Sequence, residues 1–428
     1  MDYAKALDYA GLHDLPASYA ARWAEFQALP AGRLWDNAYL LENQSLFGFS
    51  DELTKEILRV RDAVAADETL ALLARFFHWV LFVGSKPFLV EKPGALLAEK
   101  LGDDKGLFGM IPLIAETART LTAIDEYRLD RENITGNFKS LNNFANEYKK
   151  KNGHWGLDAF SWNCSCVVPY YNKCGHLGFE PISIEYDYTY YYNDKTGSSV
   201  VLCGDGISCT GDGLLTSNNC PFPAAFTTKA ARGDGWVEGF PIDPLGVALH
   251  QTVRLSLDQY RPLIKQWDVL LAFHIPSGPG YTVESTYHSL REAVSFYRRV
   301  FPDIDFKGIW CYSWLYTPQL RLLFGPAESE MVKIQRHFYQ VPAWRDSGAY
   351  TRFVYKTETL EPSTLPRGNR LHRRLAAIIE RGGHLTSGGL MLPVSLVDGW
   401  METEYDDTDS LPAFRMSQPY DANDLPTL

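Results

Sequence analysis

The chain has 428 residues, a formal net charge of -11 at pH 7 and a hydrophobic fraction of 46%. This length exceeds what one ordinary hydrophobic core supports, so we expect two or three folded domains rather than a disordered chain. The acidic charge disfavours nucleic acid and anionic membrane surfaces as main partners, because both are themselves negatively charged. The acidic net charge does not exclude a local basic pocket that binds a small ligand.

The sequence carries no pattern typical of a secretory signal or a membrane span. The N-terminus lacks a basic segment followed by an apolar one, and the longest apolar stretch, 69–83, contains Arg75 and His78. Seven cysteines in a chain without a visible export signal are most simply reduced and buried thiols. These observations predict a cytoplasmic protein.

Residues 1–152 are predicted to form a helical domain. Apolar residues recur there at helical spacing in several segments, and clusters of Pro, Gly and Asp separate them. The predicted helical segments are 18–29, 50–66, 68–82, 109–127 and 135–150.

Beyond the helical region, aromatic and β-branched residues become frequent, which is typical of strands. Segments 162–171 and 180–192 have this composition, and tyrosines alternate with smaller residues in the second. The turn 193–197 and the apolar run 199–203 predict a hairpin. Segment 204–219 is rich in Gly, Asp, Ser and Asn and predicts an irregular loop.

Residues 267–313 predict a strand, a tight turn, a long helix and a second strand. The run 267–275 is almost wholly apolar, as in a strand buried on both faces, and a Gly/Pro/Ser turn follows at 276–281. Thr282 is a natural N-cap for a helix that ends before Phe301-Pro302. The second predicted strand is 307–313, and a short helix and another strand complete the pattern by residue 340.

A strand that leads into a helix through a Gly-rich turn can bind an anion. Several backbone N–H groups and the positive end of the helix dipole converge on one point there. Many Gly-rich turns, however, only connect two elements tightly. The local pattern leaves both interpretations open.

Several motifs of the chain resemble a family of bacterial proteins identified as acyltransferases. Members pair a helical N-terminal domain with a C-terminal domain similar to the GNAT acetyltransferase fold. The most specific matching motifs are Cys311-Tyr-Ser-Trp-Leu315 and Pro318-Gln-Leu320, accompanied by His274-Ile-Pro-Ser-Gly278, Leu177-Gly-Phe-Glu180, Phe301-Pro302, Ile334-Gln-Arg-His-Phe338 and Leu371–Gly383.

The resemblance covers most of the chain and implies a multi-domain α+β fold. A helical N-terminal domain at 1–152 would precede a GNAT-like domain at 153–345, which would contain a central, mostly antiparallel sheet. Residues 346–428 would form a C-terminal extension with one amphipathic helix at 367–382 and an acidic tail.

The resemblance also implies a co-substrate, acetyl-CoA or another acyl-CoA, whose diphosphate the loop after the first strand would hold. The family's loop has Gln or Arg, two residues, then Gly-x-Gly; here Ile275 occupies the first position and Pro279 lacks an N–H group. A small amine or hydroxyl compound would be the acceptor, and no metal is expected. The predicted cofactor contacts are Ser277, Gly278, Gly280, Tyr281 and Thr282.

Direct acyl transfer requires a base for the acceptor, polarisation of the thioester carbonyl and an acid for the leaving thiolate. The resemblance implies His274 as the base and Tyr316 as the acid, with Cys311 and Ser313 facing the acceptor or the thioester. The residue types also fit a hydrogen-bonded strand-end histidine, a buried thiol and a packing tyrosine. Further candidate bases are Glu180 and Glu185.

Two other chemistries use the cysteines. Cys164, Cys166, Cys174 and His176 could surround a zinc ion, although the Cys-x-Cys spacing is unusual for a structural site. Cys311 or Cys166 could pair with a histidine as a nucleophile, but the sequence suggests no third residue to orient that histidine.

A non-catalytic protein on a GNAT-like scaffold is the alternative function. Ile275 in place of Gln or Arg would weaken cofactor binding, and exposed tyrosines at 186–192 could stack on a sugar or a peptide.

Overall fold

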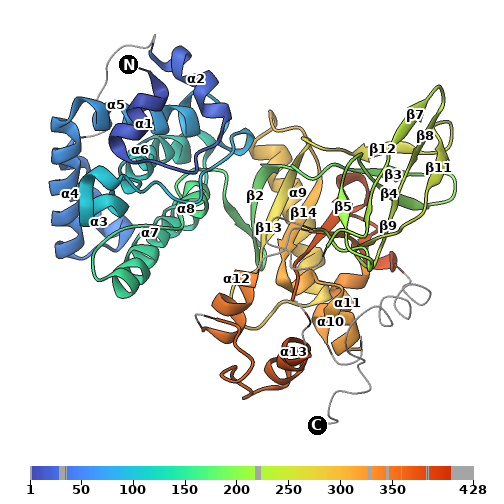
Figure 1. Ribbon diagram of the computed structural model, residues 1–428. Coiled ribbons are helices and arrows are strands. Elements are labelled where there is room, and N and C mark those ends of the chain that lie inside the picture. Colours follow the sequence, from blue (N-terminus) through green and yellow to red (C-terminus); the bar gives the residue numbers. More distant parts are fainter. Residues whose placement is uncertain are drawn as a thin grey trace. The chain divides into compact units, whose positions relative to one another are not determined.

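The structure is a computed structural model (Figure 1). It describes residues 2–27, 34, 36–216, 223–325, 329–343, 347–357, 359–381, 383 and 385–405. The chain divides into two compact units, Met1–Lys173 and Cys174–Leu428.

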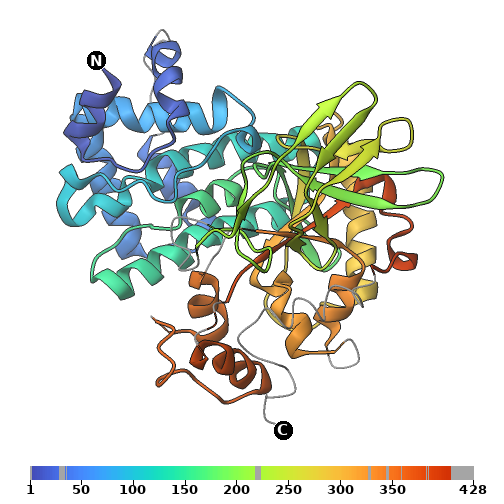
Figure 2. The ribbon, with the colours of Figure 1, turned by 45° about the vertical axis from the view of Figure 1, so that its right-hand side comes forward.

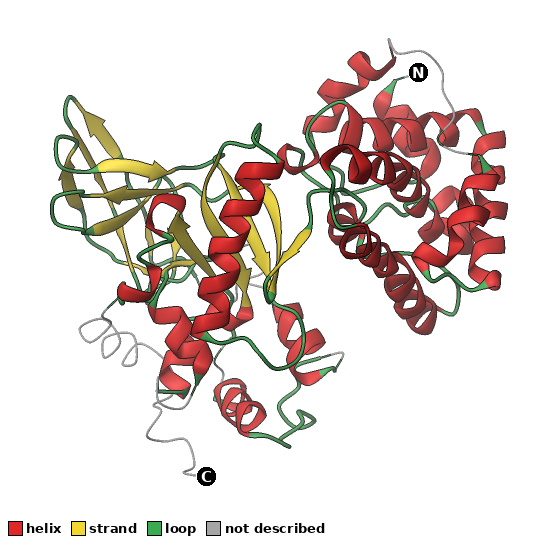
Figure 3. Ribbon diagram, turned by 180° about the vertical axis from the view of Figure 1, so that it is seen from behind, coloured by secondary structure: helices red, strands yellow, loops and turns green. Residues whose placement is uncertain are grey.

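The described part of the first unit consists of helices and loops (Figure 3). All five helical segments predicted from the sequence form helices over their described residues, although positions 28 and 29 of the first segment lie outside the described part. Helices α1, α3 and α8 are additional. The helices are α1 (Tyr3–Ala10), α2 (Ser18–Gln27), α3 (Asn37–Phe47), α4 (Asp51–Ala66), α5 (Glu68–His78), η1 (Trp79–Val83), η2 (Pro87–Leu89), η3 (Glu99–Leu107), α6 (Met110–Tyr127), α7 (Arg131–Asn152) and α8 (Phe160–Cys166).

The prediction of strand structure across 162–171 is wrong, because helix α8 occupies its first half. Phe160, Cys164 and Cys166 are buried on α8, and the Asn163 side chain donates to the Ala159 carbonyl one turn earlier. Thr120 of α6 donates to the carbonyl of Val167 just after the helix. Packing within the first unit therefore overrides the strand propensity of this aromatic segment.

Among the described residues, no single helix is long and apolar enough to cross a membrane. One bent pair, η3 with α6, passes the same length and composition test only when its two members are taken together.

The second unit contains a six-stranded sheet with the order β1-β2-β13-β14-β16-β15. β13 and β14 are parallel, whereas the β2–β13, β14–β16 and β15–β16 pairs are antiparallel, so the mostly antiparallel central sheet is confirmed. Its strands are β1 (Asn172–Cys174), β2 (Leu177–Ser183), β13 (Val269–His274), β14 (Phe306–Ser313), β15 (Tyr339–Pro342) and β16 (Gly388–Pro393).

Helix α9 (Val283–Val300) crosses one face of this sheet (Figure 3). Its Tyr297 hydroxyl donates to the carbonyl of Phe179 in β2 at 2.6 Å, while Leu290 and Ala293 are completely buried. The predicted helix, its Thr282 cap and its end at Phe301 are confirmed.

Smaller sheets cover the opposite face of the large sheet (Figure 2). Leu270, Ala272 and Trp310 of the large sheet share one hydrophobic cluster with Tyr188 and Tyr190. The remaining strands are β3 (Tyr188–Tyr192), β4 (Ser199–Cys203), β5 (Ser208–Cys209), β6 (Phe226–Thr227), β7 (Ala231–Gly233), β8 (Trp236–Gly239), β9 (Pro241–Asp243), β10 (Val247–Ala248), β11 (Val253–Ser256) and β12 (Arg261–Ile264).

The predicted hairpin is confirmed, since β3 and β4 pair across the 193–197 turn. The expectation of exposed tyrosines on it is wrong. Tyr188, Tyr190 and Tyr191 are buried, and the first two belong to the cluster between the sheets. The hairpin thus contributes core rather than an aromatic binding surface. The predicted loop 204–219 contains β5, and its residues after 216 lie outside the described part.

The segment 346–428, predicted as an extension, contributes a strand to the large sheet. β16 lies between β14 and β15, and its six residues are buried. Gly388 and Gly389 weaken the strand pattern of this segment in the sequence. They also allow the strand to pack closely, because an added Cβ at Gly388 would lie 2.0 Å from the carbonyl oxygen of Tyr316. The expected acidic tail beyond residue 405 lies outside the described residues.

The predicted amphipathic helix of this segment is present as α13 (Arg370–Glu380), and its Leu375 and Ile378 pack in a second cluster. The other helices of the unit are η4 (Trp314–Tyr316), α10 (Gln319–Leu323), α11 (Glu330–Arg336), α12 (Ser347–Ala349), η5 (Tyr350–Tyr355), η6 (Val394–Leu396) and η7 (Trp400–Glu402).

Candidate active site

The loop between β13 and α9 is shaped by two glycines and a capping box. Gly278 and Gly280 have φ angles of +111° and +108°, a region that favours glycine. Thr282 accepts from the Ser285 amide at 3.2 Å through its side chain, and the Ser285 hydroxyl accepts from the Thr282 amide at 3.0 Å. The chain is therefore held in one conformation where it enters the helix.

This loop presents backbone donors without internal partners. Within the described structure, the amides of Ser277, Gly278, Gly280 and Tyr281 donate to no other protein group. Residues 276–280 are exposed, and nothing lies within 4 Å of an ideal Cβ at Gly278. Together with the positive end of the α9 dipole, these N–H groups make an open site for an anion.

The two parallel strands separate at the end nearest this loop. Their pairing ends at Ala272 opposite Trp310. Beyond that point β13 pairs only with β2 and β14 only with β16. The Cys311 thiol donates to the Phe273 carbonyl at 3.1 Å. A side chain of β14 thus bonds to a backbone acceptor of β13 where the two strands no longer pair through their backbones.

A pair of tyrosines joins the loop to the end of β14. The hydroxyls of Tyr281 and Tyr316 lie 2.5 Å apart. Burial raises the pKa of both phenols, and also that of the Cys311 thiol, well above their ordinary values. All three groups are therefore neutral at physiological pH, which suits a proton donor and does not suit a thiolate nucleophile.

His274 and Glu180 form a second polar pair. His274 Nε2 lies 2.9 Å from Glu180 Oε1, and the Glu180 side chain is 9% exposed while that of His274 is 32% exposed. The antiparallel register places Glu180 opposite Ala272, so the carboxylate is a diagonal neighbour of His274 on the same face. A buried carboxylate that contacts one ring nitrogen orients the imidazole.

The predicted catalytic residues lie on two faces of the sheet. His274 is on the same face of the sheet as Ala272, the face towards the smaller sheets. Cys311 and Ser313 are one and three residues after Trp310, so they are on the opposite face. The separation between β13 and β14 is the place where the two faces meet. Ser313 Oγ accepts from the Leu315 amide at 3.2 Å and caps η4, which gives it a local structural role.

Two features of the site escaped the sequence interpretation. The contact of Tyr281 with Tyr316 joins residues 35 positions apart, and that of Glu180 with His274 joins residues 94 positions apart. Only the strand register and the fold bring each pair together. The sequence feature that points towards one of these contacts is the position of Tyr281 directly before the helix cap Thr282.

The zinc arrangement that the cysteine spacing left open does not occur among the described residues. The structure describes Cys164, Cys166, Cys174, Cys203, Cys209 and Cys311, all buried and none in a disulfide. In the described chain, no three His, Cys, Asp or Glu side chains are grouped so as to hold a metal ion.

Comparison with known proteins identifies the fold. Residues 173–391 match the family described as the GNAT-like C-terminal domain. The chain belongs to this family. No protein of curated function matches it in sequence.

Solved structures that resemble this GNAT-like protein include an acyltransferase bound to decanoyl-CoA, with 16% identity and a TM-score of 0.58 over 92% of this chain and 99% of that one. Another is an acyltransferase bound to CoA and 10C-teicoplanin, with 16% identity and a TM-score of 0.57 over 92% and 100% of the chains. An acyltransferase mutant bound to octanoyl-CoA has 15% identity and a TM-score of 0.57, over 92% and 99%. At this identity the likeness establishes a shared fold.

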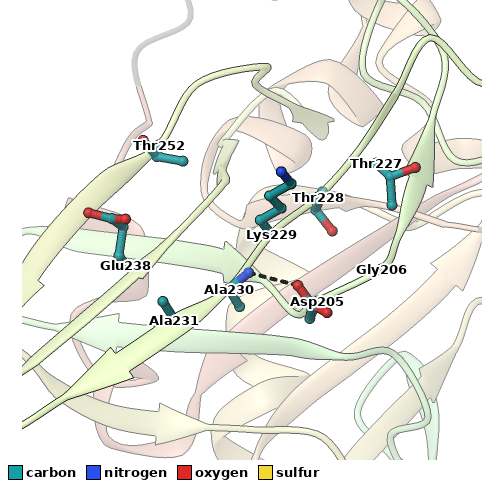
Figure 4. Close-up of a pocket in the computed structure, with 9 residues that line it drawn as sticks. All are labelled: Asp205, Gly206, Thr227, Thr228, Lys229, Ala230, Ala231, Glu238 and Thr252. Carbon is teal, nitrogen blue, oxygen red and sulfur yellow. Dashed lines mark hydrogen bonds between the residues drawn. The ribbon is translucent and has the colours of Figure 1, made fainter.

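A pocket of about 510 Å³ lies elsewhere in the GNAT-like unit, among the smaller sheets (Figure 4). Asp205 accepts from the Ala230 amide at 3.1 Å on one side of it. The other lining residues are Gly206, Thr227, Thr228, Lys229, Ala231, Glu238 and Thr252. No site residue predicted from the sequence lines this pocket.

Proposed function

We propose that this protein transfers an acyl group from acyl-CoA to the amine or hydroxyl of a small acceptor. The observation that carries the proposal is the loop 277–282, whose free N–H groups face solvent at the start of α9. Backbone donors at a helix N-terminus suit the diphosphate of coenzyme A. The family match and the acyl-CoA ligands of the similar structures support this assignment.

The separated strands suit the rest of the donor. A pantetheine arm that starts at the loop would reach the gap between β13 and β14, where each strand has lost its ladder partner. Amides of the arm would pair there with backbone groups of the two strands. The thioester would then lie between the two faces that carry His274 and Tyr316.

In the proposed reaction the acceptor nitrogen or oxygen attacks the thioester carbonyl carbon. His274 takes the proton that the acceptor loses, and Glu180 holds the imidazole in place. The C–S bond breaks, and the thiolate of coenzyme A receives a proton from the buried tyrosine pair. Both phenols carry their proton at physiological pH, because burial raises their pKa values.

Two of the similar structures contain CoA with 10C-teicoplanin and decanoyl-CoA with teicoplanin. For this chain we propose the wider class of small amines or alcohols. We also propose a cytoplasmic location, because acyl-CoA donors are metabolites of the cell interior.

A charge placed on the loop tests the proposal. Ser277 is exposed, so Ser277→Asp adds a carboxylate beside the diphosphate site, and Ser277→Asn has nearly the same shape without the charge. We expect the Kd for CoA, measured by calorimetry, to rise about tenfold in the Asp variant, equivalent to about 1.4 kcal/mol of repulsion. The Asn variant should bind within about twofold of the wild type. Equal binding by the two variants, or no binding of any acyl-CoA by the wild type, would contradict the proposed function.

A further inference from the structure

The turn between β1 and β2 is anchored on α9. Gly175 adopts a φ of +58°, and the His176 amide donates to Ser289 Oγ at 2.9 Å. The same hydroxyl donates to the carbonyl of Ser285, one turn closer to the start of the helix. The backbone of His176 is therefore fixed relative to the helix that begins at the anion-binding loop.

The imidazole of His176 lies against that loop. An ideal Cβ on Gly280 would lie 3.0 Å from His176 Cε1 and 3.3 Å from Nδ1. Gly280 thus serves two purposes, since its missing side chain permits both the positive φ and the position of the ring. The ring thus lies beside Gly280, whose amide has no partner in the described protein.

Neither ring nitrogen of His176 has a partner among the described residues. Nε2 is buried without any hydrogen bond, and no bond to Nδ1 occurs. A buried polar atom without a partner costs about 1–3 kcal/mol, so its retention needs an explanation. A half-turn of the ring exchanges Nε2 with Cε1 and brings this nitrogen to the Gly280 side.

The loop itself contributes no charged donor. Ile275 is apolar and Pro279 has no N–H group, so the loop offers a diphosphate only neutral donors, namely backbone amides and hydroxyls such as that of Ser277. A histidine beside the loop can add a side-chain donor to an anion.

We propose that His176 is a binding residue for the diphosphate of acyl-CoA and that its ring adds an N–H donor to those of the loop. The assignment rests on the proposed function and deepens it, since it names the group that selects donors with a diphosphate. The unpartnered imidazole finds its acceptor only when that ligand is bound.

Two variants and two ligands test this. His176→Phe keeps a flat ring against Gly280 but has no donor, and His176→Gln keeps a donor without the ring. We expect calorimetry to show a Kd for CoA at least tenfold higher in the Phe variant and at most about threefold higher in the Gln variant. For acetyl-pantetheine, which has no diphosphate, kcat/KM should stay within about twofold of the wild type in both variants.

The outcomes separate the two proposals. If the wild type binds CoA and the Phe variant binds it equally well, the role of His176 is refuted while the proposed function stands. Equal losses with CoA and acetyl-pantetheine would assign His176 a purely structural role. Absence of CoA binding by the wild type would refute both proposals. If the Phe variant fails to fold, His176→Leu, which also lacks a donor, replaces it. A Kd for CoA at least tenfold higher in that variant, with acetyl-pantetheine turnover unchanged, would support the contact, and an unchanged Kd would refute it.

Discussion

At the scale of single residues, the environment of His274 decides whether it can act as a base. One of its ring nitrogens contacts the buried Glu180 carboxylate, and a third of the side chain is exposed at the end of β13. A carboxylate that fixes one nitrogen leaves the other directed elsewhere, as in other base–orienter pairs. Glu185, the other carboxylate considered from the sequence, is exposed and lies two residues beyond the end of β2.

His274→Gln should lower kcat by about 10²-fold or more, because a positioned general base contributes about 10²–10⁴-fold. The Kd for CoA should change little, since the loop amides are untouched. Glu180→Gln should lower kcat by about tenfold through loss of orientation. Steady-state kinetics and calorimetry on the same samples measure both quantities.

Glu185→Gln is the matched control for this experiment, and its kcat should equal that of the wild type. If His274→Gln keeps full kcat while its melting temperature is unchanged, His274 is not the base. An equal loss in the Glu185 variant would show that the general charge of the region, rather than the pair, affects the rate.

At the scale of elements, the loop between β13 and α9 contains two glycines whose surroundings differ, although the sequence does not show this difference. Gly278 and Gly280 have similar positive φ angles, yet only Gly280 has a neighbour within 4 Å of an ideal Cβ, namely the His176 ring. Alanine at either position imposes the same kind of backbone strain, of order 1–3 kcal/mol. Alanine at Gly280 also displaces His176.

Gly278→Ala and Gly280→Ala should therefore lower the free energy of unfolding by similar amounts, about 1–2 kcal/mol in a urea titration. Their effects on ligand binding should differ, with a further loss of CoA affinity of about fivefold in Gly280→Ala. Combination of His176→Phe with each alanine variant supplies the control. The further loss of CoA affinity caused by Gly280→Ala should vanish in the His176→Phe background. If that loss persists there, it would argue against the contact between His176 and the diphosphate.

The same loop shows how far local sequence patterns reach. The strand, the turn, the Thr282 cap and the helix that ends before Phe301 all follow from short-range chemistry, and the structure contains each of them. Apolar periodicity likewise predicts the long helices of the first unit, where one face of each packs inward. These features depend on residues within a few positions of each other.

Elements whose form depends on distant partners were missed. α8 occupies an aromatic segment that resembles a strand, because it packs within a helical unit. β16 contains two glycines that weaken a strand pattern, but it fits between β14 and β15, where close approach to Trp310 and Tyr316 requires a missing side chain. The site follows the same rule: Glu180 meets His274 through strand register, and the fold brings Tyr281 to Tyr316 and His176 to Gly280.

At the scale of the whole molecule, buried thiols and phenols link stability to alkaline pH. Burial raises the pKa of Cys174 and of Cys209 to about 12, and it raises that of Cys203 and Cys311 further. Several buried tyrosines shift in the same direction. In the unfolded chain these thiols titrate near pH 8.5 and the phenols near pH 10.

The sign of the effect follows from proton binding. Above about pH 8.5 the unfolded chain loses thiol protons that the folded chain keeps, so the free energy of unfolding decreases as the pH rises. This stabilising contribution is fully present below the unfolded pKa values and is lost towards the folded ones. Each thiol that is ionised only in the unfolded state contributes roughly 1.4 kcal/mol per pH unit.

Urea unfolding at pH 7, 8, 9 and 10 should therefore give a nearly constant free energy up to pH 8 and a decrease of several kcal/mol between pH 9 and 10. Cys209→Ala removes one such thiol, so its slope above pH 9 should be shallower by roughly 1.4 kcal/mol per pH unit, even if the variant is less stable at pH 7. Because the comparison uses the slope, the packing lost with the side chain does not affect it. A wild-type free energy that stays constant from pH 8 to 10 would show that water reaches these thiols in the folded protein.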